Sequence, residues 1–283
     1  MAQQKVKYRS KITPWHLQKM KDEGKKISMM GTATLDPLFI LFAEQGGIPF
    51  CRYLAPGENS LECAEQIFTR TRQVRAIAQT ICLNAYMHSE LYPDNSKALY
   101  NTARLAQDGC DSVLMMGITN EMLKYVTDNH GLVFGHVGLL SGWQTARYGG
   151  YKKICKTAEE SMEVFRIAYE YQETGMIGMT IELVPRELTN AIAAKLRVPI
   201  IQVAGSGAAD GSELVIFDVF ELTPKETMGI HARVYGNLPE FCIDAFRRFD
   251  EDVVSGSYPA EENGWGMEPA EAEKLKNLIE QKY

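Results

Sequence analysis

The sequence lacks the signatures of three large classes of protein. It contains six cysteines in 283 residues, but no two form a C-x-x-C pair, and several, such as Cys51 and Cys82, lie within apolar runs. This pattern is typical of small buried side chains in a reducing compartment and argues against a disulfide framework or a zinc site. No apolar run approaches the roughly 18 residues that a membrane span needs. The N-terminus is too polar for a signal peptide, so we expect a cytoplasmic protein.

An excess of positive charge is also missing. The chain has 30 Lys and Arg against 36 Asp and Glu, a net charge of −6, which argues against a broad nucleic-acid surface. Residues 5–11 are basic, but this short stretch predicts a solvated arm. With 45% apolar and 23% charged residues, the chain can bury a sizeable core without disulfides. We therefore expect a small-molecule substrate and neither nucleic acid nor membrane as partners.

Short apolar runs alternate with amphipathic segments through most of the chain. Runs with strand character are residues 27–31, 48–54, 79–85, 112–116, 132–137, 177–181, 199–204 and 214–220. Segments that predict helices are residues 13–24, 36–46, 61–78, 95–107, 120–127, 157–173 and 186–196. Because the strands are apolar along their whole length, both faces of the sheet must be covered, as in a parallel sheet. The alternation predicts an α/β fold, a closed (β/α)8 TIM barrel, with an open doubly wound sheet as the alternative.

The barrel is expected to form a single domain over residues 1–283. Residues 1–26 are the N-terminal arm and helix. The tail, residues 221–283, has no strand pattern, and helices are predicted there at 238–250 and 270–281.

Two residues at predicted strand ends are candidates for catalysis, because barrel enzymes carry their catalytic groups at the carboxyl ends of strands. Glu182 follows an apolar strand and precedes a helix, so it fits a catalytic carboxylate or a helix cap equally well. His136 stands near the end of another strand, where an acid–base role, a ligand role and a satisfied core histidine all remain open.

Two glycine-rich loops are weaker candidates. Residues 142–150, with Trp143, Arg147 and Tyr148, predict either a segment that closes over a ligand or a plain surface loop. Residues 205–211 offer backbone amides to an anion, but they lack the lysine and the following helix of a phosphate-binding loop.

The chain resembles the ketopantoate hydroxymethyltransferase family over nearly its whole length. The likeness begins at residues 12–30, Ile-Thr-Pro-Trp-His-Leu-Gln-Lys-Met-Lys-Asp-Glu-Gly-Lys-Lys-Ile-Ser-Met-Met. It continues through Gly-His-Val-Gly-Leu at 135–139, Tyr-Gly-Gly-Tyr-Lys at 148–152, Ile-Glu-Leu-Val-Pro at 181–185, Asp-Gly-Ser-Glu-Leu-Val at 210–215 and Val-Val-Ser-Gly-Ser-Tyr-Pro-Ala-Glu-Glu at 253–262. The resemblance implies the barrel of the phosphoenolpyruvate mutase and isocitrate lyase group. It also implies hydroxymethyl transfer from 5,10-methylenetetrahydrofolate to a branched 2-oxo acid, in pantothenate biosynthesis.

In that family a magnesium ion chelates the 2-oxo acid and stabilises its enolate. The resemblance places the family's catalytic glutamate on Glu182 and its substrate-contacting histidine on His136. The metal ligands, however, are replaced: the family's Gly-Asp-Ser is here Leu54-Ala55-Pro56, and its second metal-binding aspartate is Asn84. A neutral amide is a weak ligand for a hard cation. We therefore predict no magnesium site, with Asn84 at most a weak ligand, and folate use rests on resemblance alone.

The fourth predicted strand also departs from the family. Leu114 and Met116 stand where the family has a lysine that contacts the oxo acid and a glutamate near the metal. We predict a more apolar substrate pocket, lined by Ala55, Asn84, Leu114 and Met116. The family's decamers imply that this chain is a homo-oligomer.

Three functions remain open at this stage. The favoured one is a divergent enzyme in which Glu182 and His136 carry out metal-free acid/base-assisted carbon–carbon or proton-transfer chemistry, on an oxo-acid-like or more apolar substrate. The second is a genuine hydroxymethyltransferase with a rebuilt metal site that draws on Glu58, Asn84, His88 or Glu90. The third is a non-catalytic paralogue that binds a ligand or an active partner. The retained Glu182 argues against the third, because a carboxylate among apolar neighbours is costly unless it has a partner or a role.

Overall fold

The computed structural model of the chain describes residues 10–33, 36–55 and 61–283, without the side chains of residues 32, 33, 61–63 and 143. Glu58, named above as a possible metal ligand, and the side chain of Trp143 therefore lie outside the described residues.

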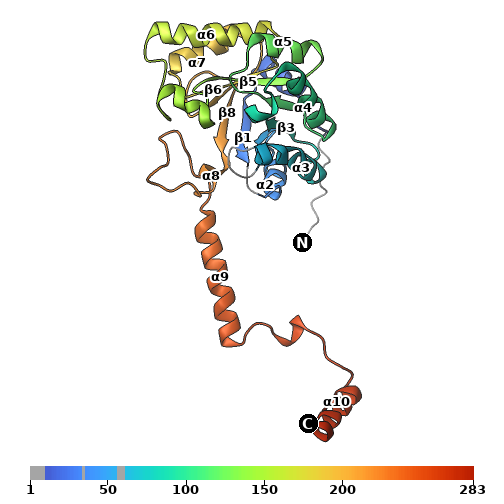
Figure 1. Ribbon diagram of the computed structural model, residues 1–283. Coiled ribbons are helices and arrows are strands. Elements are labelled where there is room, and N and C mark those ends of the chain that lie inside the picture. The colour runs from blue at the N-terminus through green and yellow to red at the C-terminus, as the bar shows by residue number, and fades with distance from the viewer. Residues whose placement is uncertain (1–9, 34–35, 56–60) are drawn as a thin grey trace. The chain divides into compact units, whose positions relative to one another are not determined.

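Eight parallel strands form a closed barrel in which the last strand pairs with the first (Figure 1). They are β1 (Ile27–Ala33), β2 (Phe50–Tyr53), β3 (Cys82–Tyr86), β4 (Ser112–Leu114), β5 (Val133–Gly138), β6 (Met179–Glu182), β7 (Ile200–Val203) and β8 (Gly211–Val215). The predicted (β/α)8 barrel is confirmed, and the open sheet is excluded because no edge strand remains between β1 and β8.

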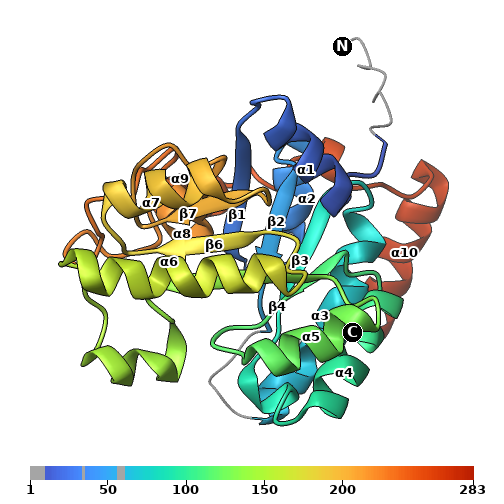
Figure 2. The same cartoon turned by 90° about the horizontal axis from the view of Figure 1, so that it is seen from above.

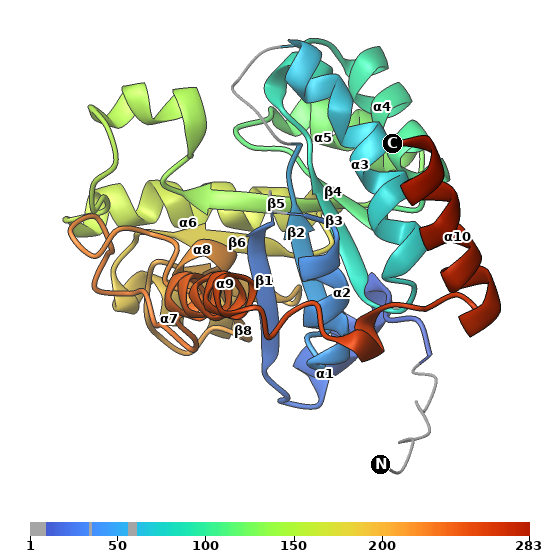
Figure 3. The ribbon, with the colours of Figure 1, turned by 90° about the horizontal axis from the view of Figure 1, so that it is seen from below.

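Helices surround the strands, as views from above and below the barrel show (Figures 2 and 3). They are α1 (Pro14–Asp22), α2 (Leu38–Gln45), α3 (Leu61–Ile77), α4 (Asn95–Gln107), α5 (Asn120–Asp128), α6 (Ala158–Glu173), α7 (Arg186–Lys195) and the short α8 (Ile216–Val219), with 3-10 turns η1 (Ser89–Leu91) and η2 (Gly142–Tyr148). Local capping explains several starts. The Asp94 carboxylate accepts from the Lys97 amide, and the Thr157 hydroxyl accepts from the Glu160 amide.

The eighth strand corrects one sequence prediction. The apolar run at residues 214–220 is not one strand, because β8 begins at Gly211 and Ile216–Val219 form α8. β8 starts in the polar stretch Gly-Ser-Glu, whose Glu213 is buried. A strand with a buried charge at an inward position lacks the continuous apolar signal on which the prediction relied.

The inner and outer faces of the strands contribute to different layers of the core. Outward positions such as Leu83, Val113 and Val137 pack in the cluster that extends to the helices. Inward positions near the amino ends of the strands form a second cluster, in which the rings of Phe50 and Phe134 lie 5.1 Å apart. Further toward the carboxyl ends, the inward positions become polar. They are Arg52, Asn84, Ser112, Thr180 and Glu213, all buried.

The described cysteines support the prediction of buried thiols. Cys51, Cys82, Cys110 and Cys155 are free and buried, and Cys242 is half-buried. In the described part of the chain, no helix has the length and apolar character to cross a membrane.

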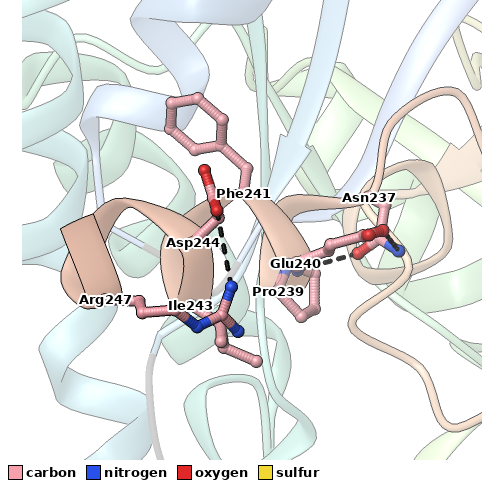
Figure 4. Close-up of a pocket in the computed structure, with 7 residues that line it drawn as sticks. All are labelled: Asn237, Pro239, Glu240, Phe241, Ile243, Asp244 and Arg247. Carbon is pink, nitrogen blue, oxygen red and sulfur yellow. Dashed lines mark hydrogen bonds and ion pairs between the residues drawn. The ribbon is translucent and has the colours of Figure 1, made fainter.

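Residues 220–222 and 234–283 form a second compact unit, separate from the unit that contains the barrel. This unit holds α9 (Leu238–Ser255), η3 (Glu261–Asn263) and α10 (Pro269–Lys282). Asn237 caps α9: its Oδ1 accepts from the Glu240 amide at 3.0 Å, and its Nδ2 donates to the Glu240 carboxylate at 3.0 Å (Figure 4). The two predicted tail helices are confirmed, α9 being longer than expected. The single-domain organisation stays a prediction.

Candidate active site

Glu182 and His136 lie together inside the carboxyl end of the barrel. They stand on the neighbouring strands β6 and β5, and Nε2 of His136 is 3.1 Å from Oε2 of Glu182. Both residues are buried, His136 at 3% and Glu182 at 7% exposure. The alternative role of Glu182 as a helix cap is not seen, since the N-cap position of α7 is Pro185 and no side chain caps it. The two predicted catalytic residues are therefore neighbours.

A glycine turn shapes the backbone around this pair. Gly138 has φ +90°, and a side chain there would overlap the carbonyl oxygen of Glu182. The Leu139 amide donates to that carbonyl at 3.0 Å, and the Leu139 carbonyl oxygen lies 2.8 Å from Nε2 of His136. Leu183, directly after the glutamate, has φ +53°, a strained conformation for a bulky side chain. Backbone strain at Leu183 and a turn that requires glycine at position 138 thus accompany the placement of the acid/base pair.

The contacts of His136 determine which ring nitrogen is available to a ligand. Nε2 faces two acceptors, the Leu139 carbonyl and the Glu182 carboxylate, so it carries the proton. In the neutral ring, Nδ1 is then an acceptor. It is buried and has no hydrogen-bond partner among the described residues. A buried unsatisfied group costs about 1–3 kcal/mol, and a ligand that donates a hydrogen bond would remove this cost.

Three hydroxyl groups extend the site beyond the pair. The Tyr151 hydroxyl interacts with the Glu182 carboxylate and with the Ser141 hydroxyl, and Ser141 also interacts with Tyr86. Loss of solvent around the hydroxyl, and next the charge of Glu182, raise the pKa of Tyr151 to about 12 although much of its ring is exposed. Tyr151 is thus protonated at neutral pH and can donate to Glu182. The sequence prediction names neither Ser141 nor Tyr151 as a site residue. Both stand in the segment after β5, and Tyr151 also belongs to the stretch at 148–152 that carries the family resemblance.

Met116 lies next to two of these hydroxyl groups, while its contact with substrate stays a prediction. Its Sδ lies 3.3 Å from the Ser141 hydroxyl and 3.9 Å from the Tyr86 hydroxyl. Leu114 is fully buried but belongs to neither hydrophobic cluster, while its neighbours Val113 and Met115 belong to the outer one. By alternation, Leu114 faces the barrel interior. Ala55 is instead buried in the outer cluster, and its contact with substrate stays a prediction.

Asn84 belongs to a buried polar network one inward position below the acid/base pair. Its Oδ1 accepts from Nε of Arg52 at 2.9 Å, and its Nδ2 donates to the Ser112 hydroxyl at 3.0 Å. Nη1 of Arg52 donates to Oε2 of Glu213 at 2.6 Å, and Nη2 donates to the Thr180 hydroxyl at 2.9 Å. Gly31 makes room for this arrangement, because a side chain there would overlap the Glu213 carboxylate.

The contacts of Asn84 in this network determine whether its position can bind magnesium. The one oxygen that Asn84 offers is engaged by a guanidinium, whose positive charge repels a second cation. Hard divalent cations prefer carboxylate-rich oxygen sites. In the described parts of the chain, no three His, Cys, Asp or Glu side chains gather as a metal site requires. The residues around Asn84 therefore do not fit the ion that the family resemblance implies.

Two of the hollows outside the barrel interior bear on where the reaction takes place. One, of about 390 Å³, is lined by His136 together with Arg147 and Tyr148 of η2. Ligand binding and closure by the η2 loop stay predictions. The other hollow, of about 690 Å³, runs along α9 (Figure 4). Its polar side chains include the ion pair of Asp244 with Arg247 at 3.5 Å. It contains no carboxylate–histidine pair, and we do not assign the reaction to it.

The glycine-rich loop at residues 205–211 leads away from the candidate active site. It carries the chain from the carboxyl end of β7 to the amino end of β8. There the Asp210 carboxylate pairs with Lys21 at 2.7 Å and accepts from the Ile200 amide at 2.8 Å. Asp210 therefore lies at the end of the barrel opposite the Glu182–His136 pair. Anion binding by the loop stays a prediction.

Comparison with solved structures supports the fold. The chain is similar to 2,3-dimethylmalate lyase, a PEP mutase/isocitrate lyase superfamily member, with a TM-score of 0.51 and 10% identity over 95% of each chain. It is also similar to oxaloacetate acetylhydrolase in complex with the inhibitor 3,3-difluorooxalacetate, with a TM-score of 0.51 and 11% identity over 89% of this chain and 100% of the other. At this identity the likeness concerns the fold alone.

Comparison by sequence defines the family. The chain is 26% identical to 3-methyl-2-oxobutanoate hydroxymethyltransferase 1 of Methylibium petroleiphilum, over 97% of this chain and 96% of that protein. It is 35% identical to the 3-methyl-2-oxobutanoate hydroxymethyltransferase of Hyperthermus butylicus, over 64% and 63%. The family model for ketopantoate hydroxymethyltransferase matches residues 11–261. The chain therefore belongs to the ketopantoate hydroxymethyltransferase family.

Proposed function

We propose that the chain is a divergent, hydroxymethyltransferase-like enzyme that moves a proton on a small 2-oxo acid, as a step in making or breaking a carbon–carbon bond. The observation that carries this proposal is the buried His136–Glu182 pair with its unpartnered Nδ1. A carboxylate that holds one ring nitrogen and leaves the other free is the usual arrangement of a histidine base.

The geometry supports the following proton path. Nδ1 of His136 takes a proton from the carbon next to the oxo group, and the C–H electron pair forms the enolate. The imidazolium so produced is stabilised by the Glu182 carboxylate at Nε2. The Tyr151 hydroxyl also interacts with that carboxylate. Proton return from Nδ1 reverses the step. In a hydroxymethyl transfer the enolate carbon would instead bond to the methylene carbon of 5,10-methylenetetrahydrofolate, both C–N bonds to that carbon would break, and water would supply the hydroxyl group. The second proton of the water and the proton held by His136 would then end on the nitrogens of the released tetrahydrofolate.

Membership of the family and the apolar residues Leu114 and Met116 define the substrate class in this proposal. An aliphatic 2-oxo acid such as 3-methyl-2-oxobutanoate, named in the relatives, suits a site that combines an acid/base pair with apolar walls. Use of 5,10-methylenetetrahydrofolate as the electrophile is part of the proposal through family membership. No step in it passes through magnesium, because the donors at Asn84 do not fit that ion.

The half-reaction offers a direct test. In D2O with a chelator present, the purified chain should exchange the C3 proton of 3-methyl-2-oxobutanoate, which proton NMR follows without a one-carbon donor. Loss of an acid–base group costs roughly 10²–10⁴-fold in rate, so Glu182→Gln should slow exchange by about that factor. The matched control is Glu187→Gln, an exposed glutamate on α7, which should leave the rate unchanged.

Two other results would contradict the proposal. Exchange that disappears with the chelator and returns with magnesium would instead support a rebuilt metal site. Tight binding of the acid without exchange would support the non-catalytic paralogue. Formation of ketopantoate on adding 5,10-methylenetetrahydrofolate would extend the activity to full hydroxymethyl transfer.

The assembly implied by the family is a separate proposal. We propose a homo-oligomer, and light scattering coupled to size-exclusion chromatography measures its mass. A monomer at micromolar concentration would contradict it.

A further inference from the structure

We propose that Arg52 is the fixed cation of the active site and that its guanidinium binds the carboxylate of the substrate from below the His136–Glu182 pair. This inference rests on the proposed function in one respect, namely that the substrate is a 2-oxo acid. Its evidence is the polar network around Arg52.

The position of the guanidinium relative to the acid/base pair is set by the strands. Nη2 of Arg52 donates to the Thr180 hydroxyl, and Thr180 stands two residues before Glu182 on β6. Side chains two residues apart on a strand point to the same face and are separated by roughly 6–7 Å. A three-carbon oxo-acid core is short enough to place its carboxylate at Arg52 while its remaining carbons stay beside His136.

The guanidinium has donors left for such a ligand. Arginine carries five N–H groups in a planar fork. Contacts with Asn84, Glu213 and Thr180 account for three of them, so two are left among the residues that the structure describes. The fork is also held in place, since Oε2 of Glu213 and the Thr180 hydroxyl lie 3.4 Å apart and receive its two ends. A guanidinium matches a carboxylate in both charge and geometry.

A purely structural role explains the network less well. Barrel interiors are filled chiefly by bulky branched apolar side chains, and a buried ion pair is seldom more stabilising than apolar residues of the same volume. Here a charged pair, 4% and 6% exposed, stands at the level directly below the acid/base pair. The charge of Arg52 also acts on the site above. It lowers the pKa of Tyr86, whereas burial raises that pKa.

The inference also accounts for the residues at the metal position. A divalent cation would need carboxylates there, whereas a guanidinium needs a neutral acceptor that leaves its charge available. Asn84 is such an acceptor, because its Oδ1 receives Nε–H and its Nδ2 is turned to Ser112. The positive charge that the family takes from a metal is thus supplied by the chain itself.

The role of Arg52 is tested by the preference of the protein for a ligand with a carboxylate over the same ligand without it. Binding to the full chain is measured by calorimetry for 3-methyl-2-oxobutanoate and for 3-methylbutan-2-one, which replaces the carboxylate by a methyl group. We expect the acid to bind at least tenfold tighter to the parent. In Arg52→Met combined with Glu213→Gln, which avoids an unpaired buried charge, this preference should vanish while binding of the ketone is unchanged. Arg52→Lys, which keeps the charge without the fork, should retain part of the preference.

The matched control is Arg75→Met. Arg75 is a partly buried arginine of α3. It pairs at 2.6 Å with Asp111, the residue just before β4. This variant should lose stability and keep the carboxylate preference. An unchanged preference in folded Arg52 variants, or a parent that binds the acid no better than the ketone, would overturn the inference. A parent that shows the Arg52-dependent preference but no C3 exchange would uphold it while contradicting the proposed function.

Discussion

Nε2 of His136 lies 3.1 Å from Oε2 of Glu182, whereas Nδ1 of the same ring has no partner among the described residues. The two nitrogens can be tested separately, because a glutamine amide reaches the position of Nε2 and an asparagine amide that of Nδ1. We expect His136→Gln to keep the contact with Glu182 and to lose about 100-fold or more in C3 exchange, since it lacks the base. Its melting temperature should stay near that of the parent. Equal activity in His136→Gln and the parent would show that Nδ1 is not the base.

Tyr151 provides a second prediction, on rate. Its hydroxyl interacts with Glu182 and Ser141, so Tyr151→Phe removes an interaction with the carboxylate that contacts His136. A net hydrogen bond to a charged group contributes about 1.5–3 kcal/mol, and we expect exchange to slow by about tenfold or more. Tyr169→Phe, at a half-exposed tyrosine on α6, is the control and should have no effect. If Tyr151→Phe exchanges at the parent rate, the Tyr151 hydroxyl has no role in the reaction.

The pKa of Tyr151 gives a pH dependence with a definite sign. The folded-state pKa of about 12 lies above the ordinary value of about 10. Between these two values the folded chain keeps a proton that the unfolded chain releases, so the free energy of unfolding falls as pH rises through this window. We expect a smaller fall in Tyr151→Phe, measured by denaturant unfolding at pH 9 and pH 11. Glu182→Gln should bring the tyrosine pKa closer to its ordinary value, because the carboxylate charge helps to raise it.

The thiols provide a prediction independent of function. Burial raises the pKa of Cys82, Cys110 and Cys155, that of Cys155 to about 11, which suppresses the reactive thiolate. Among the five cysteines whose side chains are described, Cys242 should therefore react first with Ellman's reagent. Peptide mapping of the modified protein identifies the labelled site, and Cys242→Ser should remove this first phase. Fast labelling of Cys51 in the folded chain would contradict the burial.

How far the sequence predicts this molecule depends on the range of the interactions involved. The barrel, its helices and the strand-end positions of Glu182 and His136 follow from local patterns, because apolar strands and strand-end residues are visible within a few neighbouring positions. The catalytic roles of the two residues come from the family resemblance and stay predictions. The network around Arg52 is not visible in that way, since Arg52 and Glu213 are 161 positions apart and meet only when β8 closes against β1. Inward polar residues also interrupt the apolar pattern, which is why the beginning of β8 was missed. Asn84 was predicted as a neutral residue at a lost metal position; its engagement by a guanidinium needed the fold.

Gly31 offers the most direct test that the network is built as described. A Cβ at this position would overlap the Glu213 carboxylate, which is buried and held by Arg52. Gly31→Ala must therefore displace one partner of a buried ion pair, and breaking such a pair costs about 3–5 kcal/mol. Gly205→Ala is the matched control, because the nearest atom to its added carbon would be 3.7 Å away. Chemical denaturation should show the loss of stability in the first variant alone, and the carboxylate preference of Gly31→Ala should fall with it. If the alanine is accepted without either effect, the carboxylate of Glu213 is not fixed under β1, and Arg52 lacks the rigid support that its proposed role requires.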